Sequence, residues 1–120
     1  MLRNVKNYWR PAGIEEAVAM VQSNANAAYI GGGAWTVAQG DATLETVVDL
    51  QDAGLGVLES NQESVRIGAT VTLQGIIDHP DAGALADGIL ATAAGFTQSR
   101  NLRAQGTLGG TLIVAGPADP

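Results

Sequence analysis

Near its end the sequence reads Gly106-Thr107-Leu108-Gly109-Gly110-Thr111, with Arg100 and Arg103 shortly before this stretch. Glycines let a ligand approach the main chain closely, and successive N–H groups in such a turn can form an anion-binding concavity. Thr107 and Thr111 add hydroxyl donors, and the two arginines can offset phosphate charge. One interpretation is therefore a phosphate-binding loop. The other is a glycine-containing hairpin or tight crossover, which these residues alone favour because paired glycines often mark turns.

A second glycine cluster, Gly31-Gly32-Gly33, follows a short apolar run at residues 27–30 that we expect to be a buried strand. Ala34 and Trp35 come directly after it. The cluster is not the GxGxxG fingerprint of dinucleotide-binding folds, and the residues after it lack the pattern of a clean helix. A ligand loop and a flexible turn are equally good interpretations of these residues alone.

The composition limits the kinds of protein that this chain can be. Its 120 residues are enough for one domain with a buried core. With 46% hydrophobic and 15% charged residues, the chain is too apolar for a disordered segment. The net charge of −6 argues against nucleic acid or an anionic membrane as a partner. It leaves room for one phosphorylated ligand at a local site.

Two residue types that carry much protein chemistry are scarce. The chain has no cysteine, so it contains no disulfide, no Cys-ligated iron–sulfur cluster and no thiolate nucleophile. Its single histidine, His79, argues against a His-based metal site or a Ser-His-Asp triad. The first residues lack the apolar core of a secretion signal, and no run is long enough for a membrane span. We therefore expect a cytoplasmic protein without membrane insertion.

The first half of the chain predicts one amphipathic helix among short strands. Apolar residues recur at helical spacing from residue 14 to residue 21, which predicts one apolar face. Residues 45–50 form a second apolar run that we expect to be a strand, and Asp49 is interpreted as a strand-end carboxylate rather than a catalyst. The residues on the expected helix face are Ile14, Ala17, Val18 and Val21.

The second half predicts a hairpin, two helices and a final strand. The hairpin arms are expected at residues 56–58 and 65–68. Thr72 is a good N-cap for a short helix that ends at residues 78–80, where His79 is expected to be a solvated loop residue. The Ala-rich residues 84–94 predict a packed helix, and residues 112–115 predict a strand.

These elements predict an α+β fold with two small lobes. A composition shift near Gly54 places the first lobe at about residues 1–54 and the second from about residue 55 to residue 120. Each lobe then carries one glycine cluster. Because clefts between lobes are common ligand sites, a ligand with two phosphates is expected to lie between the lobes.

Four motifs occur in an order that resembles the FAD-binding domain of the molybdenum hydroxylases. They are Tyr8-x-Arg10-Pro11, a strand leading into Gly31-Gly32, the stretch Ile67-Gly68-Ala69-Thr70-Val71-Thr72-Leu73, and Gly106-Thr107-Leu108-Gly109-Gly110. That family includes the medium subunit of carbon monoxide dehydrogenase and the flavin domain of xanthine dehydrogenase. The resemblance runs over nearly the whole chain and implies two α/β lobes of the FAD-binding (PCMH-like) type.

In that family two Gly-Gly loops hold the FAD pyrophosphate between the lobes, and the resemblance implies the same cofactor here. The expected binding residues come from both glycine clusters, from an arginine before the second cluster and from an aspartate after it. They are Gly31, Gly32, Gly33, Ala34, Trp35, Arg103, Thr107, Leu108, Gly109, Gly110, Thr111 and Asp119. No catalytic residue and no metal ligand is expected.

The chain departs from the family pattern at several positions. Ala34 lacks the hydroxyl found there, and Trp35 replaces a small polar residue, where its ring either stacks on the cofactor or fills the space. Thr111 replaces asparagine but keeps a donor. The family domain continues well past the second glycine cluster, so the second lobe is expected to be incomplete and the chain to be a fragment or a natural short form.

The resemblance implies a flavoprotein component of an oxidoreductase, which is not catalytic alone. A partner large subunit would oxidise substrate at molybdenum, and iron–sulfur clusters in a small subunit would pass electrons through FAD to an external acceptor. The flavin carries the redox chemistry, and the protein supplies binding and electrostatics. One alternative is a cofactor-free assembly or interaction domain of the same fold. Another is a small α+β domain that binds a different nucleotide phosphate.

Overall fold

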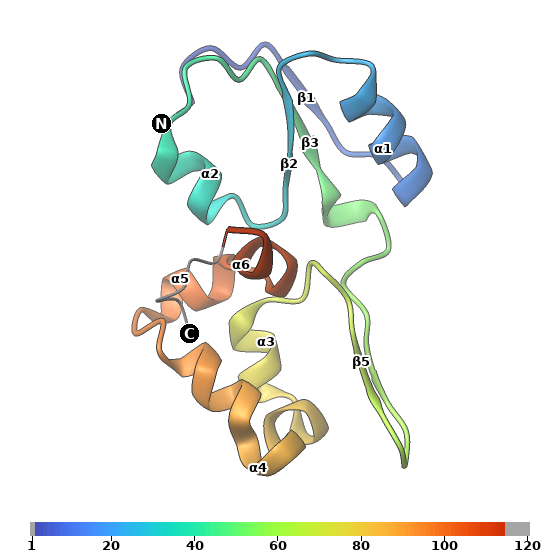
Figure 1. The fold of residues 1–120 in the computed structure, drawn as a ribbon, viewed down its shortest axis with the longest axis vertical. Helices are drawn as coiled ribbons and strands as arrows, with labels where there is room; N and C mark the ends of the chain where they lie inside the picture. Colours follow the sequence, from blue (N-terminus) through green and yellow to red (C-terminus); the bar gives the residue numbers. More distant parts are fainter. Residues whose placement is uncertain (1, 115–120) are drawn as a thin grey trace.

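The computed structural model describes residues 2–114 and has the mixed helix and strand composition expected of an α+β fold. It is elongated, with extents of 44 × 28 × 23 Å. Figure 1 shows a small sheet flanked by helices at one end of the long axis and a group of helices with a hairpin at the other. The division into lobes near Gly54 stays a prediction.

A parallel three-stranded sheet organises the first part of the chain. Its strand order is β1 (Asn7–Trp9), β3 (Thr46–Asp49) and β2 (Ala27–Ile30), so the last strand in sequence lies in the centre. All four residues of β3 are buried, as expected for a central parallel strand with both faces covered. The predicted strands at residues 27–30 and 45–50 are therefore confirmed, the second with shorter bounds. The expectation that the first of them is buried was wrong, because none of its residues is buried and Tyr29 is 40% exposed.

Helix α1 (Ile14–Gln22) confirms the helical periodicity, and its apolar face is only partly buried. Ala17 is buried, with 1% of its surface exposed, whereas Ile14 is 53% exposed and Val18 is 38% exposed. The predicted helix is therefore confirmed, and much of its apolar face is exposed. Periodicity identifies the face that is turned toward the protein, but it does not specify how much of that face a small sheet covers.

Helix α2 (Ala34–Gln39) follows Gly33, where no clean helix was expected. Its six residues are too short to show a helical period, and it is bounded by Gly33 and Gly40, which both adopt left-handed conformations. Strand β3 is followed by the 3₁₀ turn η1 (Leu50–Asp52). Asp49 caps this turn by accepting a hydrogen bond from the Gln51 N–H at 2.9 Å, which confirms its role as a strand-end carboxylate.

The hairpin consists of β4 (Leu58–Ser60) and β5 (Val65–Ile67), which pair antiparallel with Leu58 opposite Ile67. The prediction of a hairpin is confirmed, but the first arm lies two residues later than expected. The Asn61 side chain accepts hydrogen bonds from the N–H groups of Glu63 and Ser64, each at 2.8 Å, and so shapes the tip.

Helices α3 (Leu73–Asp78) and α4 (Pro80–Gly95) form the core of the second part. Thr72 caps α3 by accepting from the Gly75 N–H at 3.0 Å, as predicted. His79 is not simply a solvated loop residue, because its Nδ1 accepts from the N–H groups of Asp81 and Ala82 at the start of α4. The predicted continuous helix at 84–94 was wrong at residues 85–88, where the backbone leaves helical geometry.

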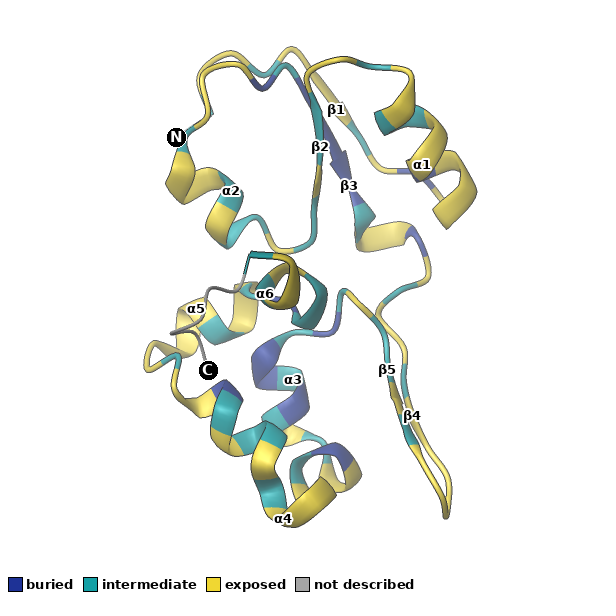
Figure 2. Ribbon diagram, in the orientation of Figure 1, coloured by how far each residue is buried: buried dark blue, intermediate teal, exposed yellow. Residues whose placement is uncertain are grey.

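Two further helices, α5 (Arg100–Gln105) and α6 (Leu108–Val114), complete the described chain. The prediction of a strand at 112–115 was wrong, because residues 112–114 belong to α6 and Ala115 lies outside the described residues. A short apolar run fits a buried strand and a helix equally well. The core of this part, shown in dark blue in Figure 2, contains Val71, Ile76 and Ala82, with Leu58, Val65, Ile67, Leu90 and Leu108 packed against them.

Candidate cofactor-binding site

The two glycine clusters, far apart in sequence, meet at the carboxyl end of the parallel sheet. The first glycine loop (residues 31–36) leaves the end of β2, and Figure 1 shows α6 beside it. A Cβ atom added to Gly31 would lie 2.8 Å from the Thr107 hydroxyl oxygen, and one added to Gly32 would overlap the Gln105 carbonyl oxygen. The second glycine loop (residues 106–111) therefore contacts the first with no space for a side chain between them.

The first glycine loop presents unpaired backbone donors. Within the described part of the chain, no backbone N–H from Gly31 to Thr36 donates to a protein acceptor. Gly33 adopts φ +75° and ψ 1°, a left-handed conformation that glycine accepts readily, and the chain then enters α2. Successive N–H groups beside a left-handed residue form a concave surface that suits an anion. The arrangement can bind phosphate oxygens without a charged side chain.

Most backbone donors of the second glycine loop bond within the protein, while the Thr107 N–H has no acceptor among the described residues. The N–H of Leu108 donates to the Val71 carbonyl and that of Gly109 to the Ala69 carbonyl, both at 2.9 Å. The N–H of Gly110 donates to the Thr107 hydroxyl at 3.1 Å. A Cβ atom at Gly109 would lie 2.9 Å from the Ala69 carbonyl oxygen. This glycine therefore permits close packing of two backbone segments.

The two threonine hydroxyls of the second glycine loop also have partners in the protein. Thr107 is buried, and its hydroxyl oxygen accepts the Gly110 N–H while it faces Gly31. The hydroxyl of Thr111 donates to the Thr107 carbonyl at 2.8 Å, and its N–H donates to the same carbonyl at 3.0 Å. Of the two, the Thr107 hydroxyl lies where the two loops meet.

Arg103 braces α5 against its neighbours. Its Nε donates to the Gln74 side chain at 2.9 Å, and its Nη1 donates to the Thr97 and Gln98 carbonyls at 2.8 Å. Gln74 is buried and in turn donates to Asp78 at 2.9 Å. These bonds join α3, α5 and the segment between α4 and α5, so the guanidinium of Arg103 is largely engaged within the protein.

The remaining expected site residues lie in different surroundings. Trp35 is 52% exposed in the first turn of α2, where it can meet a ligand, and Ala34 beside it is half-buried. Arg100 is exposed at the start of α5. Asp119 lies outside the described residues. A role for Trp35 in stacking on a cofactor stays a prediction.

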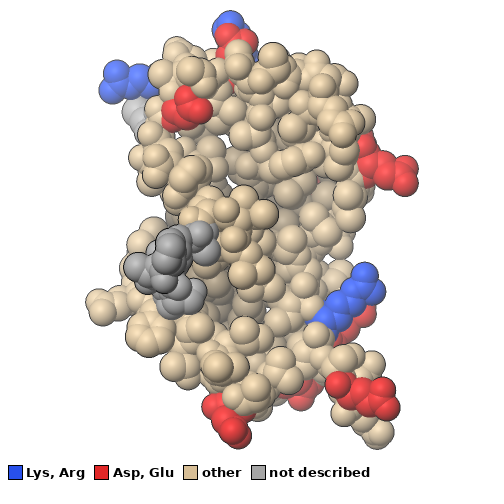
Figure 3. Space-filling model, viewed as in Figure 1, with Lys and Arg blue, Asp and Glu red and all other residues tan. Residues whose placement is uncertain are grey.

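Charged side chains contribute little to the face that contains α6. Figure 3 shows that the Lys, Arg, Asp and Glu residues visible on this face lie near its margins, while its middle consists of other residue types. Oriented backbone N–H groups carry partial positive charge of their own. The first glycine loop is therefore a source of positive potential in a chain whose net charge is −6.

The Tyr8-x-Arg10-Pro11 motif holds the carboxyl edge of the sheet. The Tyr8 hydroxyl donates to Asp49, and this hydrogen bond raises the pKa of Tyr8 above its ordinary value. Arg10 binds Asp52 through two donors at 2.9 and 3.0 Å, which raises the pKa of the guanidinium. These side chains tie β1 to the end of β3 and to η1.

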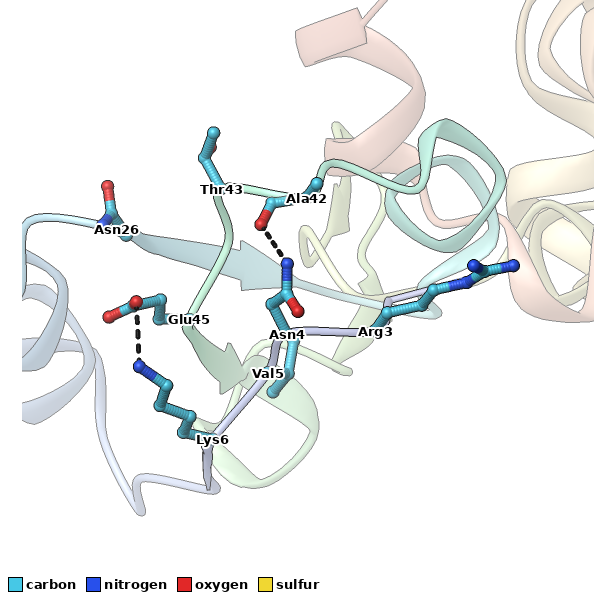
Figure 4. Close-up of a pocket in the computed structure, with 8 residues that line it drawn as sticks. All are labelled: Arg3, Asn4, Val5, Lys6, Asn26, Ala42, Thr43 and Glu45. Carbon is cyan, nitrogen blue, oxygen red and sulfur yellow. Dashed lines mark hydrogen bonds and ion pairs between the residues drawn. The ribbon is translucent and has the colours of Figure 1, made fainter.

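A polar hollow of about 440 Å³ lies at the opposite end of the sheet, before the first residues of the three strands. In Figure 4, Lys6 pairs with Glu45 at 3.0 Å, and the Asn4 amide donates to the Ala42 carbonyl at 2.7 Å. None of the residues in the two glycine loops lines this hollow. The lining residues are Arg3, Asn4, Val5, Lys6, Asn26, Ala42, Thr43 and Glu45.

Sequence reasoning missed several groups that shape the contact between the loops. The carbonyls of Ala69 and Val71 receive the N–H groups of the second glycine loop, and the Gln105 carbonyl meets Gly32. Every residue has a main-chain carbonyl, so no sequence pattern indicates directly which carbonyls make these contacts. The one available signal was the stretch Ile67-Gly68-Ala69-Thr70-Val71, which took part in the resemblance without an assigned role.

Comparison with known proteins identifies the family of the chain. The family model described as "FAD binding domain in molybdopterin dehydrogenase" matches residues 3–119. Comparison with curated protein sequences gives no match. Among solved structures, carbon monoxide dehydrogenase from Hydrogenophaga pseudoflava is 25% identical with a TM-score of 0.89, covering 100% of this chain and 43% of that chain.

Two further structures have the same fold. Reconstituted CO dehydrogenase from Oligotropha carboxidovorans is 26% identical with a TM-score of 0.87, covering 100% of this chain and 43% of that one. Quinoline 2-oxidoreductase from Pseudomonas putida 86 is 22% identical with a TM-score of 0.82, covering 93% and 40%. The chain thus spans less than half the length of these proteins. It belongs to the family of FAD-binding domains of molybdopterin dehydrogenases, whose cofactor is FAD.

Proposed function

We propose that this chain holds the diphosphate of FAD in a dehydrogenase of the molybdenum hydroxylase type. In this proposal, electrons from iron–sulfur clusters on a partner small subunit reach the flavin and leave to an external acceptor. A molybdenum-binding large subunit supplies them by oxidising the substrate. The chain contributes binding and positioning and is not catalytic alone.

The first glycine loop is the observation that carries this proposal. Its backbone donors from Gly31 to Thr36 have no acceptor among the described residues, and they lie where β2 ends. Ligands of parallel α/β sheets bind outside the carboxyl ends of the strands. A diphosphate supplies the acceptor oxygens that these donors lack. The residues present therefore fit a dinucleotide cofactor at this position.

When FAD is bound, its isoalloxazine supplies the redox chemistry. The tasks of the protein's own residues are to orient the diphosphate, through the N–H groups of the first glycine loop, and to hold that loop in shape. The proposal gives no residue of the chain the role of general base or nucleophile. Trp35, half-exposed within the loop, offers an aromatic face to the cofactor.

The partner subunits in this proposal are supported by the family to which the chain belongs. The family model describes a domain "in molybdopterin dehydrogenase". Among residues 2–114, no group of three or more His, Cys, Asp or Glu residues could hold a metal ion. No helix within that same range is long and apolar enough to cross a membrane. In the proposal, molybdenum and iron–sulfur clusters therefore belong to other chains.

The proposal is tested by the visible spectrum of the purified chain, followed by titration with FAD, ADP and riboflavin. We expect FAD to bind and ADP to compete with it, because ADP contains the same diphosphate. Riboflavin, which has no phosphate, should bind far more weakly than FAD. Equal affinity for riboflavin and FAD would contradict a site built on the first glycine loop.

A cofactor-free interaction domain is the second candidate. Exposed apolar residues on α4, α5 and α6, and directly after α4, favour it. Phe96 is 67% exposed, Leu112 is 67% exposed and Ile113 is 87% exposed. Contiguous exposed apolar surface marks interaction sites, and these side chains are available to form one. This candidate predicts a colourless protein whose melting temperature does not change when FAD is added. A clear rise with FAD would contradict it, because a ligand of the native state stabilises by mass action.

A further inference from the structure

We propose that Tyr8 is a positioning residue for the diphosphate site, because it holds the buried Asp49 carboxylate away from the backbone donors of the first glycine loop. A carboxylate and a phosphate accept from the same N–H groups, so an unrestrained Asp49 would compete with the ligand from within the chain. The effect on ADP and FAD affinity rests on the proposed function. The effect on the ligand-free loop does not, and it has a measurement of its own.

Asp49 lies where the first glycine loop begins. It is the last residue of the central strand β3 and pairs with Ile30 of β2, and Gly31 follows Ile30 directly. Because neighbouring strands are about 4.8 Å apart and consecutive Cα atoms about 3.8 Å apart, the Cα atoms of Asp49 and Gly31 lie within about 9 Å of each other. At such a separation the charge of a buried carboxylate is only weakly screened by salt.

The Asp49 carboxylate is buried and has no cationic partner among the described residues. One of its oxygens accepts from the Gln51 N–H at 2.9 Å, and the other accepts from the Tyr8 hydroxyl. The neighbouring guanidinium of Arg10 is bonded to Asp52 through two donors instead. Within residues 2–114, Tyr8 therefore provides the one side-chain hydrogen bond that Asp49 receives.

The register of the sheet explains how Tyr8 reaches this carboxylate. Tyr8 on β1 pairs with Val47, and Asp49 lies two residues further along β3, so the two side chains are on the same face of the sheet. The hydrogen bond raises the pKa of Tyr8, so its phenol stays protonated and remains a donor at neutral pH. Tyr8→Phe keeps the ring and removes only this donor.

The loss of that donor would change the neighbouring loop. One oxygen of Asp49 would be left unsatisfied in a buried position, which is unfavourable. The N–H groups from Gly31 to Thr36 have no acceptor among the described residues and lie at the same edge of the sheet. They are donors that this oxygen can take. The loop would then be occupied by the chain's own carboxylate, which a diphosphate would have to displace.

A double-mutant cycle between Tyr8→Phe and Asp49→Asn tests this role. Asp49→Asn keeps the size of the side chain and an oxygen that accepts from the Gln51 N–H, but it removes the charge. We expect Tyr8→Phe to weaken ADP binding by about tenfold in the wild-type background and to have no effect in the Asp49→Asn background. Asp49→Asn alone should bind ADP as tightly as the wild type or more tightly.

The matched control is Tyr29→Phe, which also removes one phenol hydroxyl. Tyr29 lies on β2 beside the first glycine loop and is 40% exposed, and its hydroxyl makes no hydrogen bond to another residue that the structure describes. This variant should leave ADP and FAD affinity unchanged.

Amide hydrogen exchange of the ligand-free protein gives a measurement that needs no cofactor. The N–H groups of residues 31–33 should exchange rapidly in the wild type and more slowly in Tyr8→Phe, because Asp49 then accepts from them. They should exchange rapidly again when Asp49→Asn is combined with Tyr8→Phe. A general loosening of the sheet edge would have the opposite effect and speed exchange in Tyr8→Phe.

The outcomes separate the two proposals. Equal weakening of ADP binding by Tyr8→Phe in both backgrounds, or unchanged or faster exchange of residues 31–33 in that variant, would overturn the role of Tyr8. Weaker ADP binding by Asp49→Asn alone would also overturn it, which keeps a test available if Tyr8→Phe does not fold. If the wild-type chain bound neither FAD nor ADP, the proposed function would fail. Exchange in the free protein would still decide whether Tyr8 holds Asp49 away from the loop.

Discussion

The two glycine loops are similar in sequence but differ in what their backbones do. In the first glycine loop the donors are unpaired among the described residues, and Gly33 has a left-handed conformation. In the second, the donors of residues 108–111 have protein acceptors, and Gly109 serves close packing. Two glycines in a row therefore do not define a phosphate site. What distinguishes the loops is whether the surrounding fold already supplies the acceptors.

The largest expected effect comes from Gly32→Ala, which forces the two loops apart. Its Cβ would overlap a backbone carbonyl, that of Gln105, and cannot be accommodated by a side-chain rotation. We expect a loss of about 3 kcal/mol or more in the free energy of unfolding, as for severe overpacking. Chemical denaturation monitored by tryptophan fluorescence would measure it. Unchanged stability would show that the loops do not touch as described.

Two possible roles of Arg103 predict different results. If it braces α5 through its hydrogen bonds, Arg103→Lys and Arg103→Gln should each cost about 1–3 kcal/mol, since neither variant reproduces those donors. If Arg103 acts mainly as a phosphate charge, Arg103→Lys should keep most of the ADP affinity. Unfolding and ADP titration of both variants, at low and high salt, would separate the two roles.

Gly33 tests the conformational part of the first glycine loop. A Cβ there would make only ordinary contact, 3.7 Å from the Val37 side chain, so the cost of substitution comes from φ. We expect Gly33→Ala to lose about 1 kcal/mol of stability and Gly33→Asn to lose less, because asparagine tolerates the left-handed region. Equal losses in the two variants would argue that space, not backbone conformation, selects glycine at this position.

The smallest effect is an alkaline loss of stability at the sheet edge from which the first glycine loop leaves. The hydrogen bond to Asp49 raises the pKa of Tyr8 above its ordinary value of 10.0. The folded state thus favours protonated Tyr8. The stability that this preference contributes is complete below the ordinary pKa and is lost as the pH rises through the raised pKa. Tyr8→Phe should remove that component from the pH dependence of thermal unfolding. If Tyr8→Phe left the alkaline loss of thermal stability unchanged, the stabilising role of the Tyr8–Asp49 hydrogen bond would be contradicted.

Local pattern was sufficient for several elements of this fold. The periodicity from Ile14 to Val21 predicted α1, the run at 27–30 predicted β2, and Thr72 predicted the start of α3. These signals depend on residues that are close together in the chain, so the sequence alone contains them. The order of four motifs then identified the family, which the family model and the structural comparisons confirm.

Other elements depended on contacts that the sequence does not contain. Residues 112–114 form part of a helix because Thr107 caps α6 and residues 69–71 hold its first turn, whereas the apolar run alone suits a strand as well. Helix α2 is too short for a detectable period. Arg103 was expected beside a phosphate, and its hydrogen bonds to Gln74, Thr97 and Gln98 are formed only once α3, α4 and α5 come together.

The sequence alone identified the strands and helices whose pattern was strong, and the family to which the chain belongs. Tertiary contacts bring the two glycine loops together and determine which loop keeps its donors available. The physical reason is that a backbone N–H is the same in every residue except proline. Only the position of a carbonyl from a distant segment determines whether that N–H is already bonded.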